Sequence, residues 1–341
     1  MSGDDHQVND GSAVRLDALA RAALTRWDLP ATATVTLIKH RENAVFMVAD
    51  AASSARYALR IHRAGYHSDA ELRSELAWMR ALDDDGVHTP PVLAGLDGSF
   101  LQTVPTDDPG AALRADLFGW VDGAPLGAIE DAAASDLDQL RTSLELVGAL
   151  AGHVHNQSEK WIPPPGFTRP AWDETGICGT APVWGPFTDL PQLTSAQRQM
   201  LVAAAEKLHT SLIEFGKGSD RYGLIHADFL PENLLVRDDG VRILDFDDCG
   251  YGWHMFDVAT ALFFHLGQAT FSDARTSLIA GYRTTRPLPD EHLEMLAAFL
   301  MARGLTYVSW VTSRRETETA RALSDEIIEG VTALASEYVG S

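Results

Sequence analysis

The stretch HADFLPENLL, residues 226–235, decides how this chain folds and what it does. It places a histidine and an aspartate two positions apart, and an asparagine five positions after the aspartate. The stretch LDFDDCGYGW, residues 244–253, follows and brings another acid, Asp245, at the end of an apolar run. Between the two stretches, the sequence RDDG predicts a hairpin turn that joins two short strands. The acids therefore lie on turns between buried strands.

Phosphoryl transfer is a chemistry that uses such a set. It needs metal ions and a cation on the phosphates, and a carboxylate that orients the attacking hydroxyl. We predict that Asp228 accepts the proton of the acceptor hydroxyl and that His226 braces the loop. Asn233 and Asp245 are the expected ligands of Mg²⁺, which prefers hard oxygen atoms. The alternative is that Asp228 and Asn233 only cap a turn.

Composition restricts the partners. The chain has 341 residues and a formal net charge of −21, so we expect neither a nucleic-acid nor a membrane partner. Cys178 and Cys249 lie far apart in the sequence and have no metal-ligand spacing, which favours a reduced, cytoplasmic location. Residues 1–13 are polar and lack the features of a signal peptide, and they are predicted to be a disordered tail.

Hydrophobic periodicity divides the chain into two lobes. A helix at 14–29, a helix at 68–82 with Ser68 as N-cap, and several strands are predicted first; the strands are 32–40, 43–50, 55–63, and two near 91–94 and 113–121. The pattern then turns helical, with helices predicted at 131–156, 195–215, most of 255–283, and 290–338. The fold class is therefore α+β: a small β-rich N-lobe, residues 14–120, and a larger helical C-lobe, residues 121–341.

The motifs resemble those of the aminoglycoside phosphotransferase-like family, which includes choline, homoserine and hydroxylysine kinases. The similar segments are HADFLPEN, ILDFDDCGYG and FDVATAL, and the resemblance extends from about residue 33 to about residue 330. It implies a protein kinase-like bilobal fold, with ATP and Mg²⁺ as cofactors. It also implies that Asp257 ties down the catalytic loop; the alternative is a plain helix N-cap.

The resemblance assigns nucleotide-binding residues to the N-lobe. Arg60 occupies the position of the family's strand lysine, and Glu75 is the acid expected to pair with it. Glu71, one turn earlier, is the second choice. The loop KHREN, which contains Asn43, is the expected phosphate loop. The segment LFGWVDGAPL, which contains Trp120, resembles the hinge that contacts adenine, or is an ordinary edge strand and turn.

The acceptor is expected to bind near the long segment 161–189, which is rich in tryptophan and proline. Trp172, Asp173 and Trp253 are the candidate contacts, because aromatic faces and carboxylates attract an ammonium group. The alternative is that these tryptophans only anchor the segment on the core.

The predicted function is transfer of the ATP γ-phosphate to a hydroxyl of a small, amine-bearing molecule. The alternatives are a protein Ser/Thr kinase of the same superfamily and a catalytically weak nucleotide-binding regulator, which Arg60 would favour. Other chemistries fit less well. The histidines of HVH, residues 153–155, face apart on a helix, and Cys249 follows two acids, which makes it a poor nucleophile. The oligomeric state is open.

Overall fold

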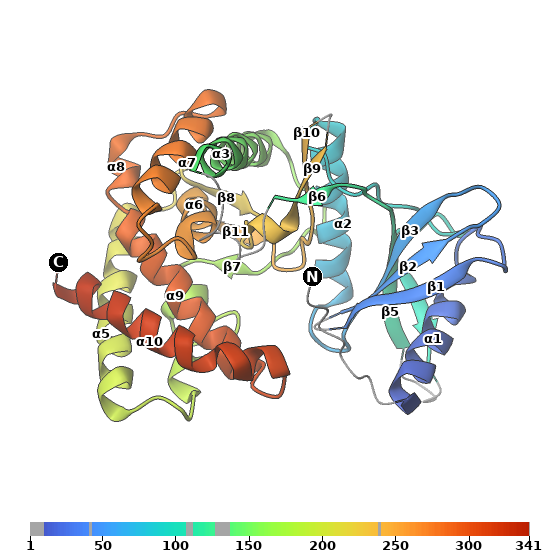
Figure 1. The fold of residues 1–341 in the computed structure, drawn as a ribbon, viewed down its shortest axis with the longest axis horizontal. Coiled ribbons are helices and arrows are strands. Elements are labelled where there is room, and N and C mark those ends of the chain that lie inside the picture. The colour runs from blue at the N-terminus through green and yellow to red at the C-terminus, as the bar shows by residue number, and fades with distance from the viewer. Residues whose placement is uncertain (1–9, 41–42, 107–111, 127–136, 238–239, 341) are drawn as a thin grey trace. The chain divides into compact units, whose positions relative to one another are not determined.

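The computed structural model describes residues 10–40, 43–106, 112–126, 137–237 and 240–340 (Figure 1). The chain divides into two compact units. Unit 1 comprises Met1–Asp84, Thr89–Asp122 and Pro163–Thr168. Unit 2 comprises Asp85–His88, Gly123–Ile162 and Arg169–Ser341. The short segment Pro163–Thr168, from the proline-rich stretch, thus belongs to unit 1 rather than to the helical part that surrounds it in the sequence.

Unit 1 is built on a five-stranded antiparallel sheet with the order β1-β2-β3-β5-β4. The strands are β1 (Thr34–His40), β2 (Ala44–Ala49), β3 (Arg56–Ile61), β4 (Gln102–Pro105) and β5 (Ala112–Gly119). Strand β2 alternates buried and half-buried residues, as expected for a strand with one face on a core. Helix α1 (Asp10–Leu24) packs against β1 and β4 and supplies Ala20 and Ala23 to that core (Figure 1).

Helix α2 (Asp69–Asp84) completes unit 1. It begins with a capping box, in which the Glu71 side chain accepts a hydrogen bond from the Ser68 backbone and Ser68 Oγ accepts one from the Glu71 backbone. The predicted N-cap is confirmed. Glu71 is thereby engaged in the helix start, while Glu75, one turn on, lies among the buried residues of the helix.

Unit 2 is mainly helical, with two small sheets. The helices are α3 (Leu137–Lys160), α4 (Glu174–Cys178), α5 (Ser195–Phe215), α6 (His254–Phe263), α7 (Phe271–Thr285), α8 (Asp290–Leu293), α9 (Leu296–Ser313) and α10 (Glu318–Gly340). One sheet has the order β10-β9-β6, from Gly240–Ile243, Leu234–Arg237 and Ala124–Pro125. The other has the order β7-β11-β8, from Ala171–Trp172, Gly250–Trp253 and Tyr222–Ile225.

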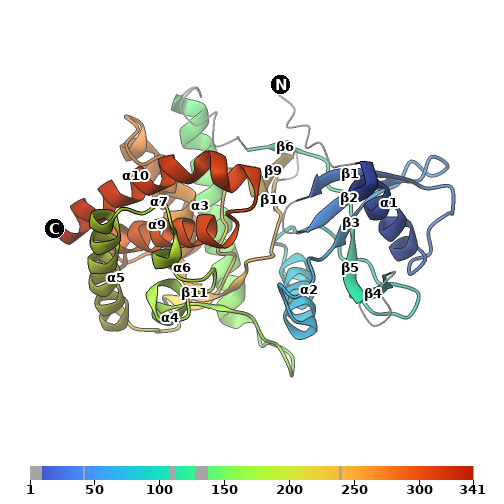
Figure 2. The same ribbon diagram turned by 90° about the horizontal axis from the view of Figure 1, so that it is seen from below.

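Helix α9 is the central helix of unit 2, and it contacts α5, α6 and α10 (Figure 2). The segment Asp290–Ser313 is apolar and long enough to cross a membrane, yet 78% of its most apolar window is buried inside the protein. A core helix explains this composition, because a helix that is apolar all round is covered on all sides.

Several predicted boundaries change. The helix predicted at 14–29 begins at Asp10 and ends at Leu24, so Asp10–Ala13 of the predicted tail are helical; residues 1–9 lie outside the described residues. The strand predicted near 91–94 is only a single bridge between Val92 and Phe118, and the strand next to β5 at the edge of the sheet is Gln102–Pro105. The helix predicted at 290–338 is three helices, and the one at 255–283 is two.

Candidate active site

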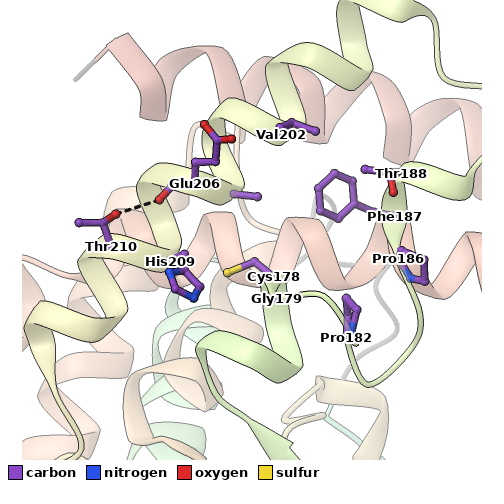
Figure 3. Close-up of a pocket in the computed structure, with 11 residues that line it drawn as sticks. Cys178, Gly179, Pro182, Pro186, Phe187, Thr188, Val202, Glu206, His209 and Thr210 are labelled. Atoms are coloured by element: carbon purple, nitrogen blue, oxygen red, sulfur yellow. Dashed lines mark hydrogen bonds between the residues drawn. The ribbon is translucent and has the colours of Figure 1, made fainter.

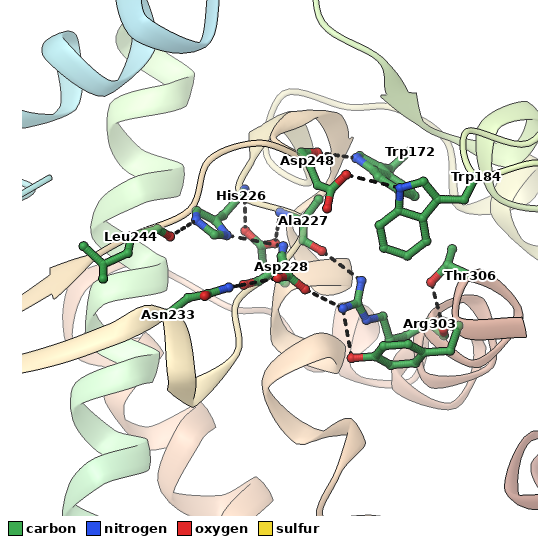
Figure 4. A network of polar contacts seen from close by, with 12 residues as sticks. Trp172, Trp184, His226, Ala227, Asp228, Asn233, Leu244, Asp248, Arg303 and Thr306 are labelled. Carbon is green, nitrogen blue, oxygen red and sulfur yellow. Dashed lines mark hydrogen bonds and ion pairs between the residues drawn. The ribbon is translucent and has the colours of Figure 1, made fainter. Parts of the chain in front are cut away.

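The loop 226–233 connects β8 to β9 in unit 2 and carries Asp228 (Figure 4). The Asp228 side chain is 23% exposed, so it is reachable from solvent although its neighbours are buried. Asn233 Nδ2 donates hydrogen bonds to Asp228 Oδ2 at 2.8 Å and to the Asp228 carbonyl oxygen at 3.0 Å. The aspartate and the asparagine five positions later are therefore in direct contact.

The backbone of the loop is strained at Ala227, whose φ of 65° lies in the left-handed region. Asp257, from the first turn of α6, accepts hydrogen bonds from the backbone of His226 and of Ala227, at 3.0 and 2.8 Å. The N-cap of α6 is Trp253, so Asp257 is not the plain cap that was the alternative. Instead, Asp257 binds the loop directly.

His226 is fully buried and links two turns. Its Nε2 donates to the Leu244 carbonyl at 2.9 Å, and its Nδ1 accepts from the Asp228 backbone at 3.3 Å. Burial lowers the pKa of His226, so the ring is neutral and one nitrogen donates while the other accepts. These contacts fit a bracing role.

Asp257 has a second histidine partner, His155 of the HVH triplet. His155 Nε2 lies 3.0 Å from Asp257, and burial lowers the pKa of His155 well below its usual value. His153 is exposed, so the two histidines face apart as predicted. Among the described residues, no three His, Cys, Asp or Glu side chains gather as a metal site.

Asn233 and Asp245, the predicted metal ligands, lie on two segments that a backbone hydrogen bond joins. The Asp228 carbonyl can only accept a hydrogen bond, so the Asn233 amide nitrogen must face it and Oδ1 must face away. The Leu244 backbone donates to the Asn233 carbonyl at 2.8 Å, which joins the two segments next to Asp245. Asp245 is exposed and has a φ of 60°, while Phe246 after it is fully buried. Carboxylate and amide oxygens are the hard donors that a divalent cation prefers.

Arg303 of α9 contacts this loop, and its position there was not predicted from the sequence (Figure 4). Its Nη2 lies 2.6 Å from Asp228 Oδ1, and its Nη1 donates to the Ala227 carbonyl at 3.0 Å. Nη2 also contacts the Tyr307 hydroxyl at 2.9 Å. Burial opposes the charge, but Tyr307 and Asp228 outweigh it and raise the pKa of Arg303. The signal in the sequence was a lone arginine in the apolar run LAAFLMARGLTYVSW.

The predicted acceptor tryptophans lie in the core. Trp172 has no exposed surface, stacks on Phe256 at 5.7 Å, and donates from Nε1 to the Asp248 carbonyl at 2.8 Å. Trp253 is likewise fully buried and donates to the Gly216 carbonyl at 2.7 Å. Their faces are covered by protein, so the geometry agrees with the alternative, that tryptophans anchor the long segment.

Asp173 is also occupied by structural contacts. It is the N-cap of α4, where it accepts from the backbone of Thr175 and Gly176. Its other oxygen pairs with Lys217 at 2.9 Å, and Lys217 also pairs with Glu174 at 2.8 Å. Burial opposes these contacts, but they lower the pKa of Asp173. A helix cap and an ion pair thus account for this carboxylate.

Asp248, in contrast, is half-buried and lies beside Trp184. Trp184 Nε1 donates to Asp248 Oδ1 at 3.2 Å (Figure 4). Burial and the neighbouring acids Asp247 and Asp228 raise the pKa of Asp248 above its usual range. Asp248 therefore lies within the electrostatic field of Asp228, in the same unit.

Unit 1 contains a buried ion cluster around Arg60. The Arg60 guanidinium lies 2.8 Å from Glu75, the predicted partner, and binds Asp116 with two contacts of 3.0 and 2.7 Å. His62 Nε2 also lies 2.8 Å from Asp116. Burial raises the pKa of Asp116, but the charges of Arg60 and His62 outweigh it and bring that pKa down to about 2. Asp116 was missed, although a lone acid inside the apolar strand ALRADLFG signals a buried partner.

The remaining predicted nucleotide-binding residues also belong to unit 1. Asn43 Oδ1 accepts from the Arg63 backbone at 3.2 Å, next to the loop residues 41–42, which lie outside the described residues. Trp120 is half-buried, and the Arg56 guanidinium lies 5.7 Å from its ring centre. Neither contact identifies a ligand by itself.

A separate pocket of about 450 Å³ opens in unit 2 between α5 and the segment that follows α4 (Figure 3). Apolar residues such as Phe187 and Val202 line it, together with Cys178, Glu206 and His209. Burial, with Glu174 and Asp173 nearby, raises the pKa of Cys178 to about 12, so the thiol is unreactive. None of the described lining residues comes from the loop 226–233, so this pocket gives no information about the reaction at Asp228.

Comparison with known proteins identifies the family. A family model described as "Phosphotransferase enzyme family" matches residues 34–293. The solved structure of a microcompartment-associated aminopropanol kinase is 33% identical and superposes with a TM-score of 0.83, over 95% of this chain and 98% of that chain.

More distant relatives agree. Amicoumacin kinase of Bacillus subtilis (strain 168) is 24% identical over 260 residues, 72% of this chain and 71% of that protein. A solved amicoumacin kinase, in complex with AMP-PNP, Ca²⁺ and Ami, is 20% identical with a TM-score of 0.72, over 95% and 93% of the two chains, and shares the fold. The predicted kinase-like α+β fold and the predicted enzyme class are confirmed. The chain belongs to the phosphotransferase enzyme family and is a small-molecule kinase of that family.

Proposed function

We propose that the protein transfers the γ-phosphate of ATP to a hydroxyl group of a small amine-bearing molecule, with an amino alcohol as the preferred acceptor. The observation that supports this most directly is the state of Asp228. Its carboxylate is exposed enough to meet a hydroxyl, yet each oxygen is held by a hydrogen bond, from Asn233 and from Arg303. Oriented carboxylates of this kind position an attacking hydroxyl.

The chain's own groups divide the work. Asp228 accepts the hydrogen bond, and later the proton, of the acceptor hydroxyl. His226 and Asp257 hold the strained loop in place through its backbone. Arg60, braced by Glu75, is the proposed cation for the nucleotide phosphates, and Asn43 and Trp120 are proposed nucleotide contacts.

The proposed metal ligands are Asn233, through Oδ1, and Asp245. When bound there, Mg²⁺ supplies charge neutralisation of the phosphate oxygens. The donor atoms are two hard oxygens on neighbouring, hydrogen-bonded segments, and these fit a divalent cation. The amicoumacin kinase structure, which was solved in complex with AMP-PNP, Ca²⁺ and Ami, supports the use of a nucleotide and a divalent metal.

The proposed acceptor class rests on the relative with 33% identity, which is named an aminopropanol kinase. With Trp172 and Trp253 buried and Asp173 capping a helix, Asp248 beside Trp184 is the better candidate for an ammonium contact. Cys178 and Cys249 do not form a disulfide bond, which fits the proposed cytoplasmic location.

The test is a γ-phosphate transfer assay with matched acceptors: aminopropanol, ethanolamine, choline, amicoumacin, and propanediol, which has the size of aminopropanol without the amine. We expect aminopropanol to have a kcat/KM at least about tenfold above that of propanediol, because one ion pair contributes more than about 1.4 kcal/mol in a partly buried site. Equal kcat/KM values for aminopropanol and propanediol would show that the enzyme does not recognise the amine.

Metal ligation is tested separately. Asp245→Ala should weaken Mg²⁺-dependent binding of AMP-PNP about 10–100-fold in calorimetry, since a carboxylate on the metal keeps the phosphates in place. The matched control is Asp138→Ala, which removes an exposed aspartate of the same unit. If both variants bind AMP-PNP like the parent, Asp245 is not a metal ligand.

A further inference from the structure

Several hydrogen bonds hold Ala227 and Asp228 at the centre of the loop, and one arginine makes two of them. The Ala227 amide donates to Asp257, and the Asp228 Oδ2 atom accepts from Asn233. The Ala227 carbonyl and Asp228 Oδ1 are both bound by Arg303 (Figure 4). Arg303 therefore holds the strained peptide and the carboxylate with a single rigid guanidinium.

The location of Arg303 is costly for the fold. Its side chain is 1% exposed in a helix that is otherwise almost entirely apolar, and burying a charge carries a large desolvation penalty. The penalty is offset by Asp228, by the Tyr307 hydroxyl and by the Tyr307 ring, whose centre lies 4.3 Å away. Apolar residues of similar volume in place of the whole pair would give a fold at least as stable, whereas loss of one partner alone destabilises it.

We propose that Arg303 is a positioning residue for phosphoryl transfer, with Tyr307 as its support. It fixes the orientation of the Asp228 carboxylate and balances its charge, so that the accessible lone pairs of Asp228 face the acceptor hydroxyl. This inference rests on the proposed role of Asp228. Such an oriented carboxylate suits a transition state that needs alignment of the hydroxyl more than its early deprotonation.

The variants Arg303→Lys and Arg303→Met separate charge from geometry. Lysine keeps the charge, but its single ammonium cannot reproduce the fork that reaches the Ala227 carbonyl and Asp228 together. We expect kcat to fall about 10–100-fold in both variants, because misplacement of a reacting group by about 1 Å has an effect of this size. The affinity for Mg²⁺-AMP-PNP should stay at the parent value.

A double-mutant cycle with Asp228→Asn distinguishes positioning from general stabilisation. If Arg303 acts through Asp228, then Arg303→Lys lowers kcat in the parent but changes it by less than about threefold in the Asp228→Asn background. The matched control is Arg286→Lys. Arg286 is equally buried in unit 2 and binds Glu159 and Asn156. Its effect on kcat should be small and the same in both backgrounds.

Each outcome decides between the proposals. Additive losses in the cycle, or a parent-like kcat in Arg303→Lys, overturn the positioning role. A parent-like kcat in Asp228→Asn alone would instead overturn the proposed function itself. Should Arg303→Met fail to fold, Tyr307→Phe replaces it in the same cycle. It removes only the hydroxyl that holds the guanidinium, and we expect a fall in kcat of about 3–10-fold, since one hydrogen bond contributes about 1 kcal/mol.

Discussion

Each unit buries an arginine against an aspartate, but the two arrangements differ in what else touches the charges. In unit 1, Arg60 binds two carboxylates, Asp116 and Glu75, which both have no exposed surface. In unit 2, Arg303 binds one carboxylate, and its other partners are neutral oxygens. Asp116 is completely covered, whereas Asp228 keeps 23% of its side chain exposed.

We call the group of Arg60, Glu75 and Asp116 the closed cluster, because its carboxylates are fully covered. The pair of Arg303 and Asp228 is open, because its carboxylate is partly exposed. The Asp116 carboxylate is enclosed by Arg60 and His62, so its main effect is on the stability of the sheet. The Asp228 carboxylate is oriented but accessible, which is what a group that meets a substrate requires. In our proposal, the covered carboxylate of Asp116 therefore stabilises unit 1 and holds Arg60, the proposed phosphate cation, whereas the accessible carboxylate of Asp228 takes part in the reaction.

The largest expected effect is that of Asp228→Asn. It removes the proposed proton acceptor and keeps the shape, so kcat should fall about 10²–10⁴-fold in the transfer assay. The variant also leaves the buried Arg303 charge without its carboxylate, so the melting temperature should fall as well. Adding Arg303→Met should restore part of that loss. An unchanged kcat would mean that the two arginine–aspartate pairs do not differ in function.

Breaking the closed cluster comes next. Arg60→Met leaves two buried carboxylates without their cation, and we expect unfolding in urea to show a loss of about 3–5 kcal/mol. Arg60→Lys should recover only part of it, because an ammonium cannot bind Asp116 with two parallel contacts. Lysine is the residue that the family resemblance implies at this position. If Arg60→Lys unfolds with the same free energy as the parent, the bidentate geometry is unimportant for stability.

The acid response of the closed cluster has a defined sign. The pKa of Asp116 is lowered from 3.8 to about 2 in the folded chain, so its contribution is fully present above pH 3.8 and is lost as the pH falls toward 2. The loss should be about 2 kcal/mol, given about 1.4 kcal/mol per pKa unit. Urea unfolding of the parent and of Asp116→Asn between pH 5 and pH 2 measures it. Parallel curves for the two proteins would contradict the assignment.

The smallest effect is expected for a partly exposed counterpart of the closed cluster, in which Lys217 binds Asp173 and Glu174. Asp173→Ala removes a helix cap and an ion pair with Lys217, whose side chain is 37% exposed. The free energy of unfolding should therefore fall by about 1 kcal/mol. The Michaelis constants for ATP and for the acceptor should not change. A rise in the Michaelis constant for the acceptor alone would indicate that Asp173 contacts the acceptor after all.

The sequence by itself predicted the residues whose spacing is local. His226, Asp228 and Asn233 lie within eight positions, so one loop brings them together, and Asp228 contacts both of the others. The alternation of apolar residues predicted the first three strands, and helix α5 matches its predicted bounds. Local periodicity determines such elements because a strand or helix must bury one side.

Tertiary structure alone decided which distant groups meet. Arg303 lies 75 positions after Asp228 and Asp116 lies 56 positions after Arg60, and nothing in the local pattern names these partners. Tryptophans that suggested a ligand site became core residues, because a large aromatic side chain is stabilised by burial whether or not a ligand is nearby. A lone charge in an apolar segment indicates that a partner exists. Only packing, which fixes the neighbours of each helix and strand, shows which partner it is.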